Sequence, residues 1–568
     1  MNNTFEHIKP NIENWPINIF HKNRDEFIKE LNQFVFNRLK QSNHSFQDLL
    51  AKTIYLENQR VRVSPWKVDP PDDKNYWHEL SQEMNAALKN SDPGDALDQI
   101  MMRIINRYNS EIVGGFNAKT FKFARKFLTA IYKRLFNKFN EGKEGGYFWG
   151  SKKTLESRLK VFGYVEETRK LFDKGTVLIV PTHFSNLDSI MVGYVLEVIA
   201  GLPAFAYGAG LNLYEVELAA YYMNRLGAYR VDRRKRNPVY LECLTSMASY
   251  SLYKGLNNIF FPGGTRSRSG AIEDKLKLGL LGSAIEAQRL FIYDKSPKKV
   301  IIVPVVLGYS FVLEAKSMVD QYLRVIGKER YMRNKDTAIT FSDRLRFFKA
   351  LFAKKSSMYL SFGEPIDVMG NRIREDGNSY DKNGNVINLE DYFRLENDLS
   401  EDAQRENVYT KLLGQKIVES FLKNNVVQPS HLISFLLFEV ILKYRKDLDM
   451  LSIIKLHPTE VQIPKFVFKT MLISAMEVLR NWDKEGKLIL DEQLKTDDLD
   501  TIIELGIKDC GIYHGERVIY QTTDNLCTEN LKLLFYYHNR LEGYKLEEEL
   551  DWSKVKEFRF IDKMGNLE

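Results

Sequence analysis

The chain has 568 residues and a formal net charge of +7, and hydrophobic residues make up 44% of it. This apolar content excludes a disordered chain, and the length predicts two or three folded domains. The three cysteines Cys243, Cys510 and Cys527 lie far apart, which excludes a disulfide framework and a cysteine-rich metal site and is typical of a reducing compartment.

No targeting or membrane-spanning segment is predicted. The stretch Met1–Trp15 lacks the basic region and apolar run of a signal peptide. No uninterrupted apolar run reaches the roughly 20 residues of a spanning helix, since glutamate or proline breaks the two best candidates, 189–210 and 431–444. Any contact with a membrane is therefore expected to be peripheral.

Residues 1–115 are predicted to form an N-terminal helical region. Apolar residues recur with helical spacing over 27–39 and 80–88, and prolines mark a loop at 65–71. No residue pattern in this region indicates catalysis.

A basic amphipathic helix is predicted over residues 120–139, which carry several lysines and arginines and no acidic residue. One face of this helix would hold the apolar side chains of Phe121, Ala124, Leu128, Ile131, Leu135 and Phe139. Such a helix suits the interface of an anionic bilayer. A helix packed on its own domain, with its basic face in water, is the alternative. Residues 344–355 repeat the composition and favour membrane contact.

Short apolar strands alternate with helical stretches between Thr176 and Val368. The predicted strands cover 176–180, 258–261, 300–307 and 358–362, and the helices between them cover 188–199, 239–254 and 276–291. This alternation predicts an α/β domain over 116–370, with a mostly parallel sheet flanked by helices. Ligands of such sheets bind at the carboxyl ends of the strands, where His183 and the segment after Phe261 are expected.

Two further regions follow the α/β domain. Residues 371–407 are polar and are predicted to be a linker or surface excursion, and residues 408–568 a C-terminal helical region that packs or lines a substrate tunnel. The sequence after Asp381 is similar to a calcium loop, but Val386 and Tyr392 replace the required glycine and glutamate. A turn at 383–384 is expected there instead.

The stretch Thr176–Asp188, TVLIVPTHFSNLD, places a histidine at the end of an apolar strand and an aspartate five residues later. Histidine can take up a proton near neutral pH, and a carboxylate bonded to its other ring nitrogen fixes the tautomer. The pair His183 and Asp188 is thus a candidate base with its orienting acid. A histidine that caps a helix after a strand is the alternative.

Two later segments are candidate anion sites. Arg233 and Arg234 lie in a run of basic residues, and arginine matches phosphate oxygens in a bidentate manner. Nucleic acid is disfavoured as the partner because further basic stripes and stacking aromatics are missing. The segment 260–270, FFPGGTRSRSG, combines glycines with Arg266 and Arg268, which suits an anion-binding loop. Solvated loops are the alternative for both segments.

The order and spacing of these segments, followed by VPVVLGY at 303–309, resembles the four sequence blocks of the glycerolipid acyltransferase superfamily. The resemblance is closest to the glycerol-3-phosphate and dihydroxyacetone-phosphate acyltransferases and covers residues 177–368. It implies that His183, oriented by Asp188, deprotonates a glycerol hydroxyl, which then attacks the thioester of acyl-CoA or acyl carrier protein.

The resemblance also implies binding residues and a location. The acceptor-phosphate and donor contacts would come from Arg233, Arg234, Gly264, Thr265, Arg266, Arg268 and Pro304, the last near the acyl donor. It implies no metal or redox cofactor, and a peripheral enzyme of phospholipid biosynthesis at the cytoplasmic face of a bacterial membrane.

One departure from the family pattern concerns the acceptor. Gly263 stands where most of the superfamily has a glutamate that helps to hold the acceptor, and Glu273 or Asp274 is a candidate replacement. A lysophosphatidate acyltransferase and a non-catalytic acyl-thioester- or lipid-binding scaffold therefore remain alternatives. A hydrolase that uses Ser185 or Ser189 is disfavoured, because no nucleophile-elbow glycines surround either serine.

Overall fold

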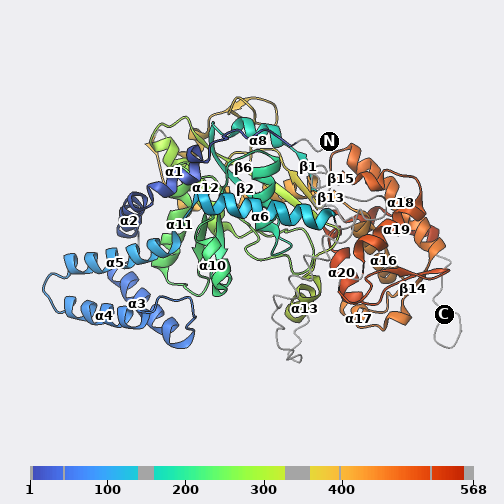
Figure 1. Ribbon diagram of the computed structural model, residues 1–568, viewed down its shortest axis with the longest axis horizontal. Helices are drawn as coiled ribbons and strands as arrows, with labels where there is room; N and C mark the ends of the chain where they lie inside the picture. Colours follow the sequence, from blue (N-terminus) through green and yellow to red (C-terminus); the bar gives the residue numbers. More distant parts are fainter. Residues whose placement is uncertain are drawn as a thin grey trace.

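The computed structural model describes residues 4–42, 45–137, 159–326, 358–395, 398–511 and 514–555. Within these residues, a seven-stranded sheet forms the centre of the molecule (Figure 1). Its strands are, in spatial order, β1 (Leu159–Gly163), β7 (Met358–Phe362), β6 (Lys299–Tyr309), β2 (Gly175–Pro181), β5 (Asn258–Ile259), β3 (Ala206–Gly210) and β4 (Ala228–Val231). Neighbouring strands are parallel except β6 and β7. This confirms the predicted α/β fold with a mostly parallel sheet.

Strand β2 lies between β5 and β6, and Val177 to Val180 are almost completely buried. A strand covered on both faces needs a continuous apolar run rather than an alternating one, which the sequence of β2 supplies. The four predicted strands are present. The short strands β1, β3 and β4 have no such run and were not predicted, since β3 reads AYGAG and β4 only AYRV.

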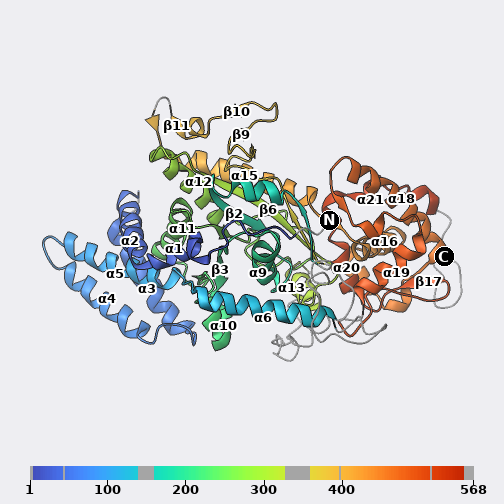
Figure 2. The same ribbon diagram turned by 45° about the horizontal axis from the view of Figure 1, so that its top comes forward.

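Helices cover both faces of the sheet. On one side lie α11 (Pro238–Tyr253), α12 (Leu278–Tyr293) and α15 (Ala403–Lys423), which pack on one another and on β2 and β6. On the other side lie α9 (Asp188–Tyr194), its continuation as a π-helix over Val195–Ile199, and α6 (Ala118–Asn137) (Figure 2). The shorter helices of the domain are α8 (Val165–Leu171), α10 (Glu217–Met223) and α13 (Ala315–Ile326).

The N-terminal helices share one apolar core with the α/β domain. They are α1 (Pro16–Lys22), α2 (Arg24–Gln41), α3 (Phe46–Val63), α4 (Asp73–Ala87) and α5 (Gly94–Ile112). Their buried side chains form one cluster with Tyr240 and Met247 of α11 and Tyr229 of β4. The N-terminal region is therefore anchored on α11.

Helix α6 crosses the front of the α/β domain in Figure 1, and its side chains are described as far as residue 130. The predicted bilayer face turns inward over this part, because Ala124 is buried and Phe121 and Leu128 pack against the apolar cores. Phe123 and Phe127 are exposed aromatic side chains in the described part of this helix. The burial of this face does not support its predicted contact with a bilayer over the described turns. Residues 138–139 and 344–355 lie outside the described residues.

The polar segment 371–407 folds as a surface excursion (Figure 2). It contains β8 (Arg372–Ile373), β9 (Ser379–Tyr380) and β10 (Val386–Ile387), followed by β11 (Arg394–Leu395) and β12 (Asp398–Leu399). The turn expected at 383–384 is present. Gly384 there has a φ of +86°, and the Asp381 side chain accepts hydrogen bonds from the backbone N–H groups of Asn383 and Asn385.

The C-terminal region is built around α16 (Pro429–Tyr444), which is buried on nearly all sides. Around it lie α17 (Met450–Ile454), α18 (Lys465–Lys484), α19 (Leu499–Cys510), α20 (Leu531–His538) and α21 (Leu546–Glu549), with the short strands β13 (Val426–Val427), β14 (Gln462–Pro464), β15 (Ile489–Leu490), β16 (Tyr520–Gln521) and β17 (Asn525–Cys527). Its apolar side chains join those of the sheet in one continuous core. None of the helices in the described ranges is long and apolar enough to cross a bilayer.

Candidate active site

His183 lies at the carboxyl end of β2, in the turn that leads into α9. Figure 2 labels both elements. Its Nδ1 is 2.7 Å from Oδ2 of Asp188, and the side chain is 21% exposed. No hydrogen bond engages its Nε2 among the residues that the structure describes. The predicted pair is thus brought together, with the free ring nitrogen available to a substrate hydroxyl.

Asp188 is completely buried, and its carboxylate is held by four interactions. Besides the histidine ring, Oδ2 accepts hydrogen bonds from the backbone N–H groups of Phe184 at 2.6 Å and Ser185 at 2.8 Å. Oδ1 accepts a hydrogen bond from the hydroxyl of Tyr309 at 2.6 Å. A buried carboxylate is stable only when such donors surround it. This role of Tyr309 could not be predicted from the sequence, because the contact crosses from β6 to the turn that follows β2.

The loop over residues 262–270, which we call the arginine loop, packs directly against the His183 turn. The backbone N–H of Ser267 donates to the carbonyl of His183 at 2.7 Å. The ring of Phe261, which precedes the loop, lies 4.4 Å from the imidazole, centroid to centroid. Arg266 and Arg268 flank Ser267 and are thereby placed beside the candidate base.

Three of the predicted cations gather at the arginine loop. Arg233 is exposed, and its Nη2 donates to the carbonyl of Gly264 at 2.5 Å. Arg266 is 29% exposed, and Arg268 is exposed, as is Thr265. Gly264 has a φ of +70°, which glycine adopts without strain.

Arg234 has a structural position instead. Its guanidinium donates to the carboxylates of Asp69 and Asp232 and to the carbonyl of Ser64, and it lies over the ring of Trp66 at 4.2 Å. Carboxylates thus occupy the donors that a phosphate would need. These contacts do not support the predicted phosphate contact of Arg234, and they tie the N-terminal region to the α/β domain.

Pro304 is also placed differently from the expectation. It lies buried inside β6, opposite Val180 of β2, and its carbonyl accepts the backbone N–H of Gly363 at 2.7 Å. It does not line the cavity described below. Pro304 therefore completes the sheet behind the site, and the predicted donor contact is not supported.

The space beside Gly263 is filled by a carboxyl group. A Cβ atom on Gly263 would lie 3.1 Å from Cγ and 3.2 Å from Oε1 of Glu273. The same Oε1 accepts the backbone N–H of His183 at 2.7 Å. Burial raises the pKa of Glu273 to about 7. Of the two candidate replacements, Glu273 occupies this place, whereas Asp274 is exposed.

Glu314 joins the remaining parts of the site. It is 4% exposed and accepts hydrogen bonds from the backbone N–H of Asn186 at 3.0 Å and the hydroxyl of Ser185 at 3.2 Å. Its Oε1 also lies 3.5 Å from Nη1 of Arg266. Glu314 thus connects the His183 turn with the arginine loop. Ser185 is engaged by this carboxylate, and no histidine contacts it among the described residues, which argues against a serine nucleophile.

A cavity of about 420 Å³ opens beside the His183 turn, which it reaches at Asn186 and Leu187. Helices α6, α9 and α10 form most of its wall, and the side chains that line it are mainly apolar. They include Phe121, Ala124, Leu128, Ile190, Gly193, Leu196, Tyr222 and Met223. The inward face of α6 is therefore one wall of a pocket suited to an apolar ligand.

No group of three or more histidine, cysteine, aspartate or glutamate side chains that could hold a metal ion occurs in the described ranges.

The chain was compared with known protein families. Residues 163–308 match the family model described as Acyltransferase, a range that contains the His183 turn, the arginine loop and β6 as far as Gly308. This part of the chain is therefore similar to an acyltransferase domain. The matched range thus contains β2, β3, β4 and β5, most of β6, and the pair His183 and Asp188.

Individual relatives of the acyltransferase domain are bacterial. The chain is 26% identical over 265 residues to a glycerol-3-phosphate acyltransferase of Pseudomonas putida KT2440, which covers 46% of this chain and 28% of the relative. It is 25% identical over 358 residues to a glycerol-3-phosphate acyltransferase of Glaesserella parasuis, with 61% of this chain and 39% of the relative covered. The chain thus spans well under half of the length of either relative.

Among solved structures, the chain matches the 1-acyl-sn-glycerophosphate (LPA) acyltransferase PlsC from Thermotoga maritima. The two are 16% identical, the TM-score is 0.23, and the match covers 65% of this chain and 94% of the other.

Proposed function

We propose that this chain is an O-acyltransferase that moves a fatty acyl group from a thioester, acyl-CoA or acyl carrier protein, to a hydroxyl of glycerol 3-phosphate or dihydroxyacetone phosphate. One observation carries the proposal. His183, whose Nδ1 is paired with the buried Asp188, lies in a turn that contacts the arginine loop at Ser267 and borders an apolar cavity at Asn186 and Leu187. These are the three elements that acyl transfer to a phosphorylated alcohol requires.

The chemistry follows from the position of the histidine. Nε2 of His183 takes the proton of the acceptor hydroxyl. The hydroxyl oxygen of the acceptor attacks the thioester carbonyl carbon at the same time and forms the new C–O bond. The tetrahedral intermediate then collapses, the C–S bond breaks, and the imidazolium returns the proton to the leaving thiolate. Asp188 stabilises the imidazolium throughout and keeps Nδ1 as the protonated nitrogen.

The acceptor phosphate binds to Arg233, Arg266 and Arg268 in this proposal. Arginine forks bind phosphate oxygens through charge-assisted hydrogen bonds. Arg233 contacts the arginine loop, Arg266 and Arg268 belong to it, and the loop is hydrogen-bonded to His183 through Ser267. Glu314 limits the movement of Arg266.

The acyl chain of the donor lies in the cavity between α6, α9 and α10. The volume of about 420 Å³ falls within the usual range for small-molecule sites, and its lining offers few polar groups to an alkyl chain. The thioester would then lie at the Asn186 end of the cavity, beside the His183 turn.

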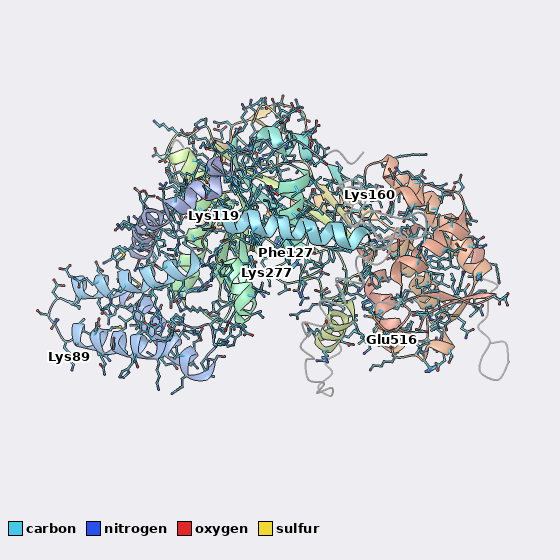
Figure 3. All side chains as sticks on the ribbon, in the orientation of Figure 1. Lys89, Lys119, Phe127, Lys160, Lys277 and Glu516 are labelled. Carbon is cyan, nitrogen blue, oxygen red and sulfur yellow. The ribbon has the colours of Figure 1, made fainter. Side chains whose placement is uncertain are left out.

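Contact with an anionic membrane surface is proposed at the rim of this cavity. The rings of Phe123 and Phe127 stack on the outer side of α6, and Ile190 and Leu213 are both exposed and part of the cavity wall. Lysines 119, 122 and 126 are exposed on the same helix, and Figure 3 labels Phe127 and Lys119 there. Apolar side chains flanked by lysines suit a surface of acidic lipids.

The membrane contact is tested by co-sedimentation with vesicles that contain phosphatidylglycerol. Phe123→Ala with Phe127→Ala is expected to lower vesicle binding about tenfold or more, because both rings lose their insertion into the interface. The matched control is Tyr55→Ala, which removes an exposed aromatic ring from α3. Equal binding by all three proteins would contradict the proposed surface.

The acyl transfer is tested with the purified full chain and labelled acyl thioesters. Glycerol 3-phosphate, dihydroxyacetone phosphate and lysophosphatidate are offered in turn, and the product is identified by mass spectrometry. Transfer to one of the first two is expected, with loss of activity in His183→Ala and full activity in the exposed control His457→Ala.

Three results would overturn parts of the proposal. Transfer to lysophosphatidate alone would change the acceptor, and full activity of His183→Ala would refute the mechanism. Acyl-CoA binding without transfer to any acceptor would identify a non-catalytic scaffold.

A further inference from the structure

The C-terminal region reaches the His183 turn through one buried arginine. Arg540 follows α20 and is 5% exposed. Its Nη2 donates to the carbonyl of Leu307 in β6 at 2.5 Å, and its Nε donates to the Asn425 side chain at 3.0 Å. Its guanidinium carbon lies 4.0 Å from the ring centroid of Phe184, the residue next to His183. Arg540 thus contacts both the catalytic turn and the neighbouring strand.

The same region also holds the two segments that flank the turn. A Cβ atom on Gly270, the last residue of the arginine loop, would lie 2.1 Å from the carbonyl oxygen of Tyr536. The Asn539 side chain donates to the carbonyl of Ser269 at 2.9 Å, and the hydroxyl of Tyr537 accepts the backbone N–H of Val312 at 3.0 Å. The arginine loop and the segment after β6 are therefore packed on the C-terminal region.

The positive charge of Arg540 favours the ionised form of Glu273, a buried carboxyl group beside the His183 turn. Two carboxylates contact His183, Asp188 at the ring Nδ1 and Glu273 at the backbone N–H. Oε2 of Glu273 is buried with no hydrogen-bond partner in the described part of the chain. Burial raises the pKa of Glu273 to about 7, and the Asp188 charge adds to this effect, whereas the His183 N–H and the Arg540 charge oppose it. Burial lowers the pKa of Arg540 to about 10, so that Arg540 stays charged at neutral pH.

We propose that Arg540 is a positioning residue that acts together with Glu273 to hold the His183 turn in its active geometry. Arg540 stabilises the Glu273 carboxylate, and this carboxylate fixes the backbone N–H of His183, while the Phe184 ring rests on the guanidinium. The C-terminal region is then a part of the active site. The role in turnover rests on the proposed acyl transfer.

The kinetic test compares Arg540→Met, Arg540→Lys and Glu273→Gln in the full chain. Arg540→Met is expected to lower kcat about tenfold or more with KM for both substrates within about twofold, because Arg540 touches neither substrate. Arg540→Lys keeps the charge and is expected to restore most of kcat. Arg480→Met, which breaks an exposed ion pair of α18, is the matched control and is expected to leave kcat unchanged.

The pH profile separates positioning from simple support of the fold. Loss of the cation favours the neutral form of Glu273, so that the carboxylate is protonated at higher pH. The acid limb of kcat in Arg540→Met should then move upward by about one pH unit, and by markedly less when Glu273→Gln is also present. A fall in thermal stability with an unmoved acid limb, or full activity of Arg540→Met, would refute the proposal.

An NMR readout remains if the wild-type chain transfers no acyl group. The protein is labelled with 15N-histidine, and the amide signal of His183 is assigned among the nine histidines by its loss in His183→Ala. This N–H donates to Glu273, so that its chemical shift follows the ionisation of that carboxyl. A midpoint near pH 7 in the wild type and a higher one in Arg540→Met support the inference. Equal midpoints refute it, independently of the proposed function.

Discussion

Asp188→Asn should lower kcat of acyl transfer by about 30- to 1,000-fold while the fold is kept. Asparagine has the shape of aspartate and can satisfy the same partners. Oδ2 of Asp188 accepts two backbone N–H groups, from Phe184 and Ser185, so that the amide oxygen of the variant must take this place. The amide nitrogen then faces Tyr309, whose hydroxyl can accept a hydrogen bond. His183 keeps its protonated Nδ1 and its free Nε2.

What the variant loses is the negative charge. Unit charges about 4 Å apart interact by about 4 kcal/mol at an effective dielectric constant of about 20, and the imidazolium carries only part of its charge in the transition state. A loss of about 2 to 4 kcal/mol corresponds to about 30- to 1,000-fold in kcat. A flipped amide would force the wrong histidine tautomer and cost more, about 10,000-fold.

The assay is steady-state acyl transfer with thermal unfolding measured in parallel. Asp188→Ala serves as the contrasting variant, because it leaves two buried backbone N–H groups without an acceptor at about 1 to 3 kcal/mol each and should lower the melting temperature clearly. Asp188→Asn should melt within a few degrees of the wild type. A loss of activity as large as that of His183→Ala, or no loss at all, would refute the role given to the charge.

Three further predictions concern the acceptor, the donor and the fold. Gly263→Glu should lower activity about tenfold or more, since the new side chain meets Oε1 of Glu273. Adding Glu273→Gly to this variant should recover part of kcat if a carboxyl group at position 263 can replace the one at position 273. Gly193→Leu should fold normally, because no atom lies within 4 Å of a Cβ there, but it fills the cavity and should shift product profiles toward shorter acyl chains in a mixed acyl-CoA assay. Arg266→Gln should raise KM for glycerol 3-phosphate about 10- to 100-fold through the loss of a charged hydrogen bond, whereas Arg234→Gln should lower the melting temperature with little change in KM.

The local parts of the site could be read from the sequence. A buried strand that ends in Pro181 and a helix that begins at Asp188 leave a short turn, so that a histidine in the turn and the aspartate must lie close together. The glycines of the arginine loop likewise indicated a loop, and Gly264 has the positive φ that favours glycine. Such geometry depends on a few neighbouring residues, and neighbouring residues are what a sequence shows directly.

Contacts between distant segments could not be predicted in this way. Arg233 and Arg234 are adjacent and chemically identical, yet one reaches the arginine loop while the other is enclosed by carboxylates, among them Asp69, 165 positions earlier. Nothing local distinguishes an exposed arginine at this loop from one that holds two regions together. The role of Arg540 beside the His183 turn is hidden for the same reason.

The direction of α6 shows the same division between sequence and tertiary structure. The sequence by itself determined that this segment is a basic amphipathic helix with an apolar face. It also determined that His183 follows the end of a buried strand and precedes Asp188 by five residues. Only the tertiary structure decided that this apolar face lines the cavity beside the site. It also decided which carboxylate fills the space next to Gly263. Helical periodicity gives the direction of a side chain around the helix axis. The segment that packs against this side chain depends on how the rest of the chain folds.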